Sequence, residues 1–135
     1  MPPFAHLRKP LAESRLALVS TGGVHLPGQE RFDIDDPRGD CSYREVPGSA
    51  TELTWTHAYY ARRRGPGGEE DLDAVFPLWT LRGLEGEGVF GELNRRHFSF
   101  MGAIHDPAPL VEETAPEVAG HLQRDGVEAV LLTPS

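Results

Sequence analysis

Cysteine is almost absent from this sequence, which has one, Cys41, among 135 residues. A single thiol excludes an internal disulfide and any paired-cysteine redox or zinc motif within these residues. Long apolar runs are also lacking, and the N-terminus has no signal-peptide pattern, so the sequence predicts a cytoplasmic protein without a membrane-spanning helix. Lysine and arginine total 13 against 21 acidic residues, and the formal net charge of -8 disfavours binding to nucleic acid or to an anionic membrane.

Several short motifs that would indicate a particular chemistry are missing as well. No GxGxxG follows the first predicted strand, and no GxSxG elbow occurs. The acidic stretch 33–40 lacks the glycine and glutamate positions of a calcium loop, so we expect its carboxylates in Asx turns. A zinc site of His25, His57 and His105 has no closely spaced ligand pair to favour it, and we expect no metal site.

The patterns that are present predict one α/β domain over residues 1–135. Strands are expected over 14–20, 52–57, 96–102 and 127–132, and helices over 77–85 and 109–125. The second helix should break at Thr114 and stop at Gly126. The last strand is almost continuously apolar, which is typical of a buried parallel strand. We therefore expect an open, mostly parallel Rossmann- or flavodoxin-like sheet flanked by helices and incomplete at its C-terminus.

Ligands of open parallel α/β sheets bind just past the carboxyl ends of the strands. The turn at Thr21-Gly22-Gly23 could bring backbone N–H groups to an anion there. For His25 and His57, an acid/base role and a structural role beside the core both stay open. The candidate substrate-pocket residues are Thr21, Gly22, Gly23, His25, His57, Ser99, Met101, Thr133 and Ser135. The residues alone thus predict a pocket and no particular reaction.

Short motifs along the chain resemble, in order, the selenoprotein B family of glycine, sarcosine and betaine reductases and of D-proline reductase. They lie at 9–15, 18–25, 32–33, 36–37, 39–40, 42–45, 56–57, 59–60, 75–78 and 97–102. The resemblance implies a reductase in which a selenol or thiol attacks the α-carbon of the substrate, or an adduct held by a pyruvoyl-bearing partner subunit. The amine or ring nitrogen then leaves, and a dithiol is the reductant. An acidic residue that often follows the Thr-His pair in the family is Ala58 here, which puts a carboxylate role at that position in doubt.

The family's nucleophile comes directly after a strand that resembles 127–132 and its Thr-Pro turn. This chain ends at Ser135. Because selenocysteine is encoded by a codon usually read as stop, we expect the reading frame to be truncated at that codon. No catalytic residue and no cofactor is then expected within residues 1–135. The alternatives are an end chosen deliberately for the expressed segment and a true stop in a degenerate homologue.

The resemblance also implies partners, namely the pyruvoyl-bearing proprotein subunit and other reductase components acting on a small amino-acid-like substrate. Homo-oligomerisation stays open, and the sequence does not select among glycine, sarcosine, betaine and proline. The competing functional class is a non-catalytic α/β module that binds a small ligand or another subunit and keeps the family scaffold without its nucleophile.

Overall fold

A computed structural model of the chain describes residues 5–56 and 72–134. Its strands are β1 (Arg15–Ser20), β2 (Val24–His25), β3 (Tyr43–Pro47), β4 (Thr54–Trp55), β5 (Glu92–Leu93), β6 (Arg96–Phe100) and β7 (Ala129–Thr133). Its helical elements are η1 (Leu11–Glu13), α2 (Leu72–Val75), α3 (Leu78–Gly86), the π-helical turn η2 (Leu110–Thr114) and α4 (Ala115–Arg124). In this described part of the chain, no helix combines the length and the apolar character needed to cross a membrane.

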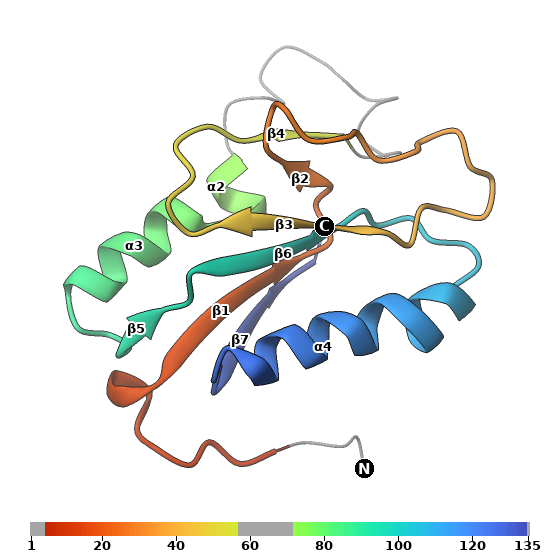
Figure 1. Cartoon of the computed structure of the whole chain (residues 1–135). Coiled ribbons are helices and arrows are strands. Elements are labelled where there is room, and N and C mark those ends of the chain that lie inside the picture. The colour runs from red at the N-terminus through yellow and green to blue at the C-terminus, as the bar shows by residue number, and fades with distance from the viewer. Residues whose placement is uncertain (1–4, 57–71, 135) are drawn as a thin grey trace.

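The main sheet is organised around β1, the apolar strand whose residues Leu16, Ala17 and Leu18 are buried. On one side β1 pairs in parallel with β5 and β6, and on the other it pairs in parallel with β7. β3 adds an antiparallel strand beyond β6 (Figure 1). The predicted open and mostly parallel α/β sheet is therefore confirmed.

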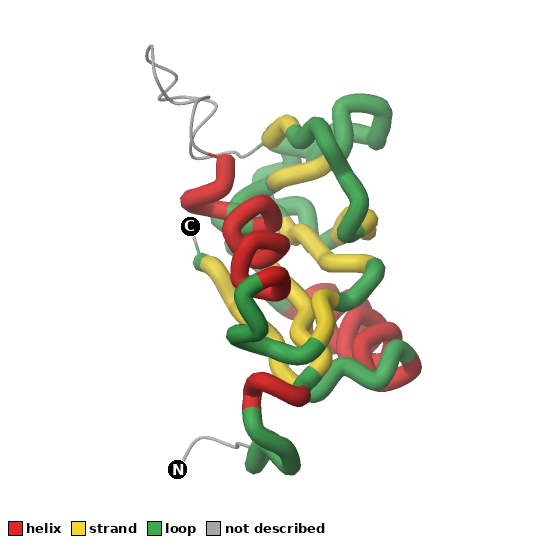
Figure 2. Tube along the Cα trace, turned by 90° about the vertical axis from the view of Figure 1, so that its left-hand side faces the viewer, coloured by secondary structure: helices red, strands yellow, loops and turns green. Residues whose placement is uncertain are grey.

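Helices cover both faces of this sheet, with α2 and α3 on one face and α4 on the other (Figures 1 and 2). Side chains alternate between the two faces along a strand. In β6 this alternation places Phe98 and Phe100 in a cluster with Val118 of α4. Leu16 and Leu18 of β1 pack in the larger cluster with Phe76, Leu78 and Leu81. Burying each of these large side chains contributes about 1.5–3 kcal/mol to folding.

The predicted helix boundaries are confirmed in part. The sequence predicts a break at Thr114, but the helical backbone continues there: the π-helical turn ends at Thr114, α4 begins at Ala115, and Thr114 makes no side-chain capping hydrogen bond. Pro77 directly precedes α3. Gly126 follows α4 with φ of 75°, the left-handed conformation that suits glycine at a helix end.

The prediction of a main-sheet strand over 52–57 is wrong. Of the described residues 52–56, Thr54 and Trp55 form a strand, β4, which pairs antiparallel with β2 in a separate two-stranded sheet. The N–H of Thr56 donates to the carbonyl of Gly23 at 2.8 Å, so this segment is held beside the turn that follows β1. β3, which lies outside the four predicted strands, takes the place at the sheet edge beside β6.

The expected burial of the last strand is not observed. Within the described residues β7 pairs only with β1 and lies at the sheet edge. Val130, Leu131 and Leu132 are 41%, 38% and 68% exposed. A strand needs neighbours on both edges and cover on both faces to be buried, and the described residues of this chain do not supply them all.

Candidate functional site

Three hydroxyl side chains lie in register at the carboxyl ends of the parallel strands. Ser20 of β1 is the register partner of Ser99 in β6 and of Thr133 in β7. Register partners in a sheet point to the same face, so these side chains form a row, here called the hydroxyl row. The row lies on the face covered by α2, because both Ser20 and Thr133 bond to the carbonyl of Val75.

The last residue of α2 is fixed directly on the hydroxyl row. Ser20 Oγ donates to the Val75 carbonyl oxygen at 2.9 Å, and Thr133 Oγ1 donates to the same oxygen at 2.7 Å. Ser20 Oγ also accepts from the N–H of Gly22 at 3.0 Å. Ser99 is fully buried, and its Oγ has no hydrogen-bond partner among the described residues.

The Thr21–Gly23 turn joins the ends of the three strands. The N–H of Thr21 donates to the Thr133 carbonyl at 3.2 Å, and the N–H of Gly23 donates to the Phe100 carbonyl at 2.9 Å. Gly22 also forms an antiparallel bridge with Met101. The N–H groups of Gly22 and Gly23 are thus used within the fold, which removes the basis for the anion site predicted at this turn.

Gly22 is required at its position by close packing. A Cβ atom on Gly22 would lie 2.0 Å from Cγ1 of Val75, a distance that real atoms do not adopt. Gly23 has φ of 71°, which disfavours residues with a side chain. The turn therefore depends on two glycines to bring α2 against the strand ends.

His25 lies buried beside the core, with hydrogen-bond partners for its ring. The ring is 2% exposed and lies edge-on to Phe32 with 6.1 Å between ring centroids. Nδ1 lies 2.7 Å from the Leu26 carbonyl, so this nitrogen carries the proton and donates. Nε2 lies 2.9 Å from the Thr56 hydroxyl oxygen, within hydrogen-bond distance. Both ring nitrogens therefore have partners within the fold.

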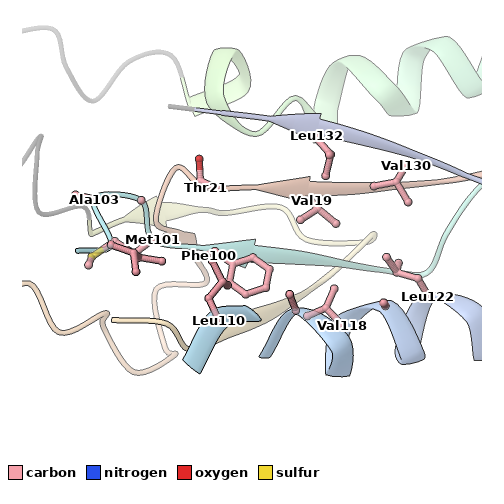
Figure 3. A pocket seen from close by; sticks show the side chains of 14 residues that line it. Val19, Thr21, Phe100, Met101, Ala103, Leu110, Val118, Leu122, Val130 and Leu132 are labelled. Carbon is pink, nitrogen blue, oxygen red and sulfur yellow. The ribbon is translucent and has the colours of Figure 1, made fainter. Parts of the chain in front are cut away.

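An apolar groove lies on the other face of the sheet, between α4 and the strands β1 and β7 (Figure 3). Its volume is about 680 Å³. The residues that line it are Val19, Thr21, Phe100, Met101, Gly102, Ala103, Ile104, Leu110, Ala115, Val118, Ala119, Leu122, Val130 and Leu132. Thr21 and Met101 lie at its end nearest the strand termini, so the groove adjoins the candidate site.

Cys41, the one thiol of the sequence, is not suited to nucleophilic attack. Its Sγ donates to the Asp106 carbonyl at 3.5 Å, and the residue is buried. Burial raises the pKa of the thiol, and the carboxylates of Asp106 and Asp40 raise it further. A thiolate, which is the reactive form, is therefore disfavoured at Cys41.

The acidic loop that includes Asp33 to Asp40 uses its carboxylates as predicted, in Asx turns. Asp33 accepts from the N–H of Asp35 at 3.0 Å, and Asp36 accepts from the N–H of Arg38 at 2.9 Å. Over residues 5–56 and 72–134, no group of three or more His, Cys, Asp or Glu side chains could hold a metal ion.

The structure thus brings together Thr21, Gly22, Gly23, Ser99, Met101 and Thr133, all from the predicted set. His57 and Ser135 lie outside the described residues. Sequence reasoning missed Ser20 and the Val75 carbonyl. Ser20 is a polar residue at the carboxyl end of an apolar strand, and this position could have indicated that it belongs to the site. A backbone carbonyl has no side-chain signal at all.

The model of the family described as glycine/sarcosine/betaine reductase selenoprotein B matches residues 3–135. D-proline reductase subunit gamma of Acetoanaerobium sticklandii is 35% identical over 136 residues, which cover 98% of this chain and 53% of that protein. Glycine reductase complex component B subunit gamma is 31% identical in Peptoclostridium acidaminophilum, over 93% of this chain and 28% of that protein.

The same subunit from Peptoclostridium litorale is 31% identical over 91% of this chain and 28% of its own length. The chain therefore spans about half, or less, of the length of these relatives. The search of solved structures found no significant match. On the match over residues 3–135, the chain belongs to the selenoprotein B family of glycine, sarcosine and betaine reductases.

Proposed function

We propose that the whole protein is a subunit of a glycine-, sarcosine-, betaine- or D-proline-reductase-type complex and carries its nucleophile, a selenocysteine or cysteine, directly after Ser135. One observation carries the proposal. β7 ends at Thr133, in register with Ser20 and next to the Thr21–Gly23 turn. A residue directly after Ser135 would therefore follow the end of β7 by only a few positions. Open parallel sheets hold their reacting groups at these strand ends.

The proposed chemistry is the one that the resemblance to the family implies. A selenolate or thiolate attacks the α-carbon, so that a selenium–carbon or sulfur–carbon bond forms while the carbon–nitrogen bond breaks. The bonding electron pair leaves with the nitrogen, which takes a proton. A dithiol then supplies the two electrons that release the reduced product and restore the nucleophile. Cys41, buried and with a raised pKa, does not fit the attacking role.

The described residues would position the nucleophile. Thr133 is held by its hydroxyl bond to Val75 and by the bond from Thr21 N–H to its carbonyl. These two bonds fix the direction in which the chain leaves β7. Ser20 is the register partner of Thr133, and Ser99 lies one strand further on, beside Ser20 in β6, buried and without a hydrogen-bond partner among the described residues.

The partners are proposed by the same reasoning. The relatives are named as subunits of D-proline reductase and of a glycine reductase complex. We expect this protein to act with a pyruvoyl-bearing subunit and other reductase components on a small amino-acid-like substrate. A cytoplasmic location stays a prediction from the sequence.

The experiment starts from the genomic reading frame. We expect a TGA or cysteine codon directly after the codon for Ser135, followed in frame by more coding sequence. The whole product, assembled with its neighbouring subunits, should consume dithiol only when one of the four substrates is added. The chain 1–135 in the same assembly should show no substrate-dependent dithiol consumption. A TAA or TAG codon at that position, or turnover by the chain 1–135, would refute the proposal.

A further inference from the structure

The apolar groove has walls whose side chains are left partly exposed. On β7, Leu132 is 68% exposed and Val130 is 41% exposed, and both line the groove. Val118 of α4 lies on the facing wall (Figure 3). The small side chains of Ala115 and Ala119, also on α4, line the groove as well. Apolar surface of this kind marks a place where another apolar element packs. Alanines on a helix permit close approach of a second helix.

β7 offers a free strand edge next to this groove. Among the described residues it pairs only with β1. The Thr133 carbonyl accepts from Thr21, so the backbone groups of Thr133 face β1. The backbone N–H and C=O groups of successive residues point alternately to the two edges of a strand. The backbone groups of Leu132 and Val130 therefore face the free edge. The strand sequence Ala-Val-Leu-Leu-Thr has no charge and no proline to prevent pairing there.

The handedness of the existing crossovers selects the face on which a further helix would pack. From β6 the chain passes through α4 to β7, crossing β1, with α4 on the groove face. From β1 the chain reaches β5 and β6 in the opposite direction, with α3 on the other face. Both arrangements follow the single hand that parallel crossovers adopt. A parallel strand added beyond β7 continues the first direction, so its connecting helix would lie on the α4 face, in the groove.

We propose that the segment following Ser135 in the whole protein forms a helix that fills the apolar groove beside α4 and then a parallel strand that pairs with the free edge of β7. The inference rests on the proposed function, because it requires the chain to continue. The relatives have room for such a unit, since this chain spans 53% of one and 28% of the others. The expected helix is amphipathic, with its apolar face toward Leu132, Val130 and Ala119.

The test uses the whole reading-frame product with cysteine at any selenocysteine position. Ala119→Trp places a large side chain in the groove, where the proposed helix must lie. Val111→Trp is the matched control, because Val111 is 66% exposed just before α4 and does not line the groove. If the groove is filled, Ala119→Trp overpacks it and should lower the Tm of the whole protein by about 4 °C or more, whereas Val111→Trp should leave that Tm almost unchanged. The chain 1–135 should tolerate both substitutions with little change in Tm.

Amide hydrogen exchange supplies a second measurement on the same proteins. The N–H groups of Val130 and Leu132 should be protected in the whole protein and should exchange at least tenfold faster in the chain 1–135. Unchanged Tm of the Ala119 variant, or equally fast exchange in both proteins, would overturn the inference. A Tm loss that depends on protein concentration, with dissociation of a dimer, would assign the groove to a second copy and overturn it too.

The two proposals fail in distinguishable ways. If no coding sequence follows Ser135, the proposed function fails. If the whole protein shows substrate-dependent dithiol consumption while Ala119→Trp leaves its Tm unchanged, the docking inference fails alone.

Discussion

Ser20 and Thr133, register partners on β1 and β7, donate their hydroxyl hydrogens to one and the same acceptor, the backbone carbonyl of Val75. The two bonds, of 2.9 and 2.7 Å, attach the end of α2 to the carboxyl ends of two parallel strands. The attachment matters for the proposed chemistry because it holds the end of β7 in place, and β7 leads directly to the position at which we place the nucleophile.

Replacing Thr133 by valine removes one of these bonds while keeping the shape of the side chain. We expect a loss of about 1 kcal/mol in the free energy of unfolding, since the part-buried Val75 carbonyl loses one of its two hydroxyl donors. In the assembled reductase, kcat should fall while the substrate KM stays close to that of the parent, because the nucleophile is displaced and the binding surface is not. Denaturant unfolding and steady-state kinetics are the measurements. Thr133→Ser, which retains the donor, should restore both values, and a serine variant as impaired as the valine variant would contradict this role.

Gly22→Ala should be strongly destabilising. The added Cβ would lie 2.0 Å from Val75 Cγ1, so α2 must move from the strand ends. We expect a loss of at least ~2 kcal/mol in the free energy of unfolding. Gly28→Ala is the control, because nothing lies within 4 Å of a Cβ at that position.

A double substitution tests the cause of this loss. Val75→Ala removes the clashing methyl group, so Gly22→Ala should cost clearly less in that background. A double-mutant cycle measures the coupling between the two positions. Strict additivity of the two losses would show that the Gly22–Val75 contact is not the reason glycine is needed.

Stability should fall in mild acid because of His97. This residue is fully buried, its Nδ1 accepts from the Leu18 N–H at 2.9 Å, and burial lowers its pKa from 6.5 to about 4. The unfolded chain therefore binds more protons than the folded chain between these values, and stability falls as the pH drops from about 6.5 to about 4. The total effect is at most about 3 kcal/mol.

The variant His97→Gln isolates this effect from the titration of carboxylates in the same range. It should be less stable at pH 7 and yet show a flatter pH dependence than the parent between pH 6.5 and 4. His105→Gln, at an exposed position, should keep the parent's pH dependence. If the free energy of unfolding of the parent and of His97→Gln fell equally with pH between 6.5 and 4, the acid sensitivity would belong to other groups.

Patterns that depend on local chemistry were predictable from the sequence. The alternation in 96–102 and the apolar run in 14–20 correspond to β6 and β1. Pro116 and Gly126 mark the start of α4 and the end of its last turn, because proline suits the first turn and glycine suits a left-handed φ. These signals need no knowledge of distant parts of the chain.

Pairing between distant segments was not predictable in the same way. β3 ends in Pro47 and lies in a stretch rich in glycine and proline, so it resembled a loop. Its partner β6 lies about fifty residues away, and its place at the sheet edge tolerates the proline. The segment at Thr54 has the composition of a strand, but it pairs with β2 outside the main sheet. The bond from Thr56 N–H to the Gly23 carbonyl holds it beside the turn after β1, and the sequence does not indicate this long-range contact.

The candidate site shows the same division. Thr133 and Gly22 were found because parallel strands end at one edge of the sheet. The shared acceptor, the Val75 carbonyl, has no side-chain identity and was missed. The sequence also does not indicate the partners of the His25 ring, the Leu26 carbonyl and the Thr56 hydroxyl, because one of them is a backbone group and the other lies 31 residues away.

The most direct test of the central claim is alkylation of the whole protein, isolated with its partner subunits, followed by mass spectrometry of the peptide that spans Ser135. We predict that a selenocysteine or cysteine directly after Ser135 is alkylated at neutral pH, and that prior incubation with substrate protects it, while Cys41 stays unmodified. A peptide that terminates at Ser135, or a residue at that position whose labelling is absent or unaffected by every substrate, would contradict the account.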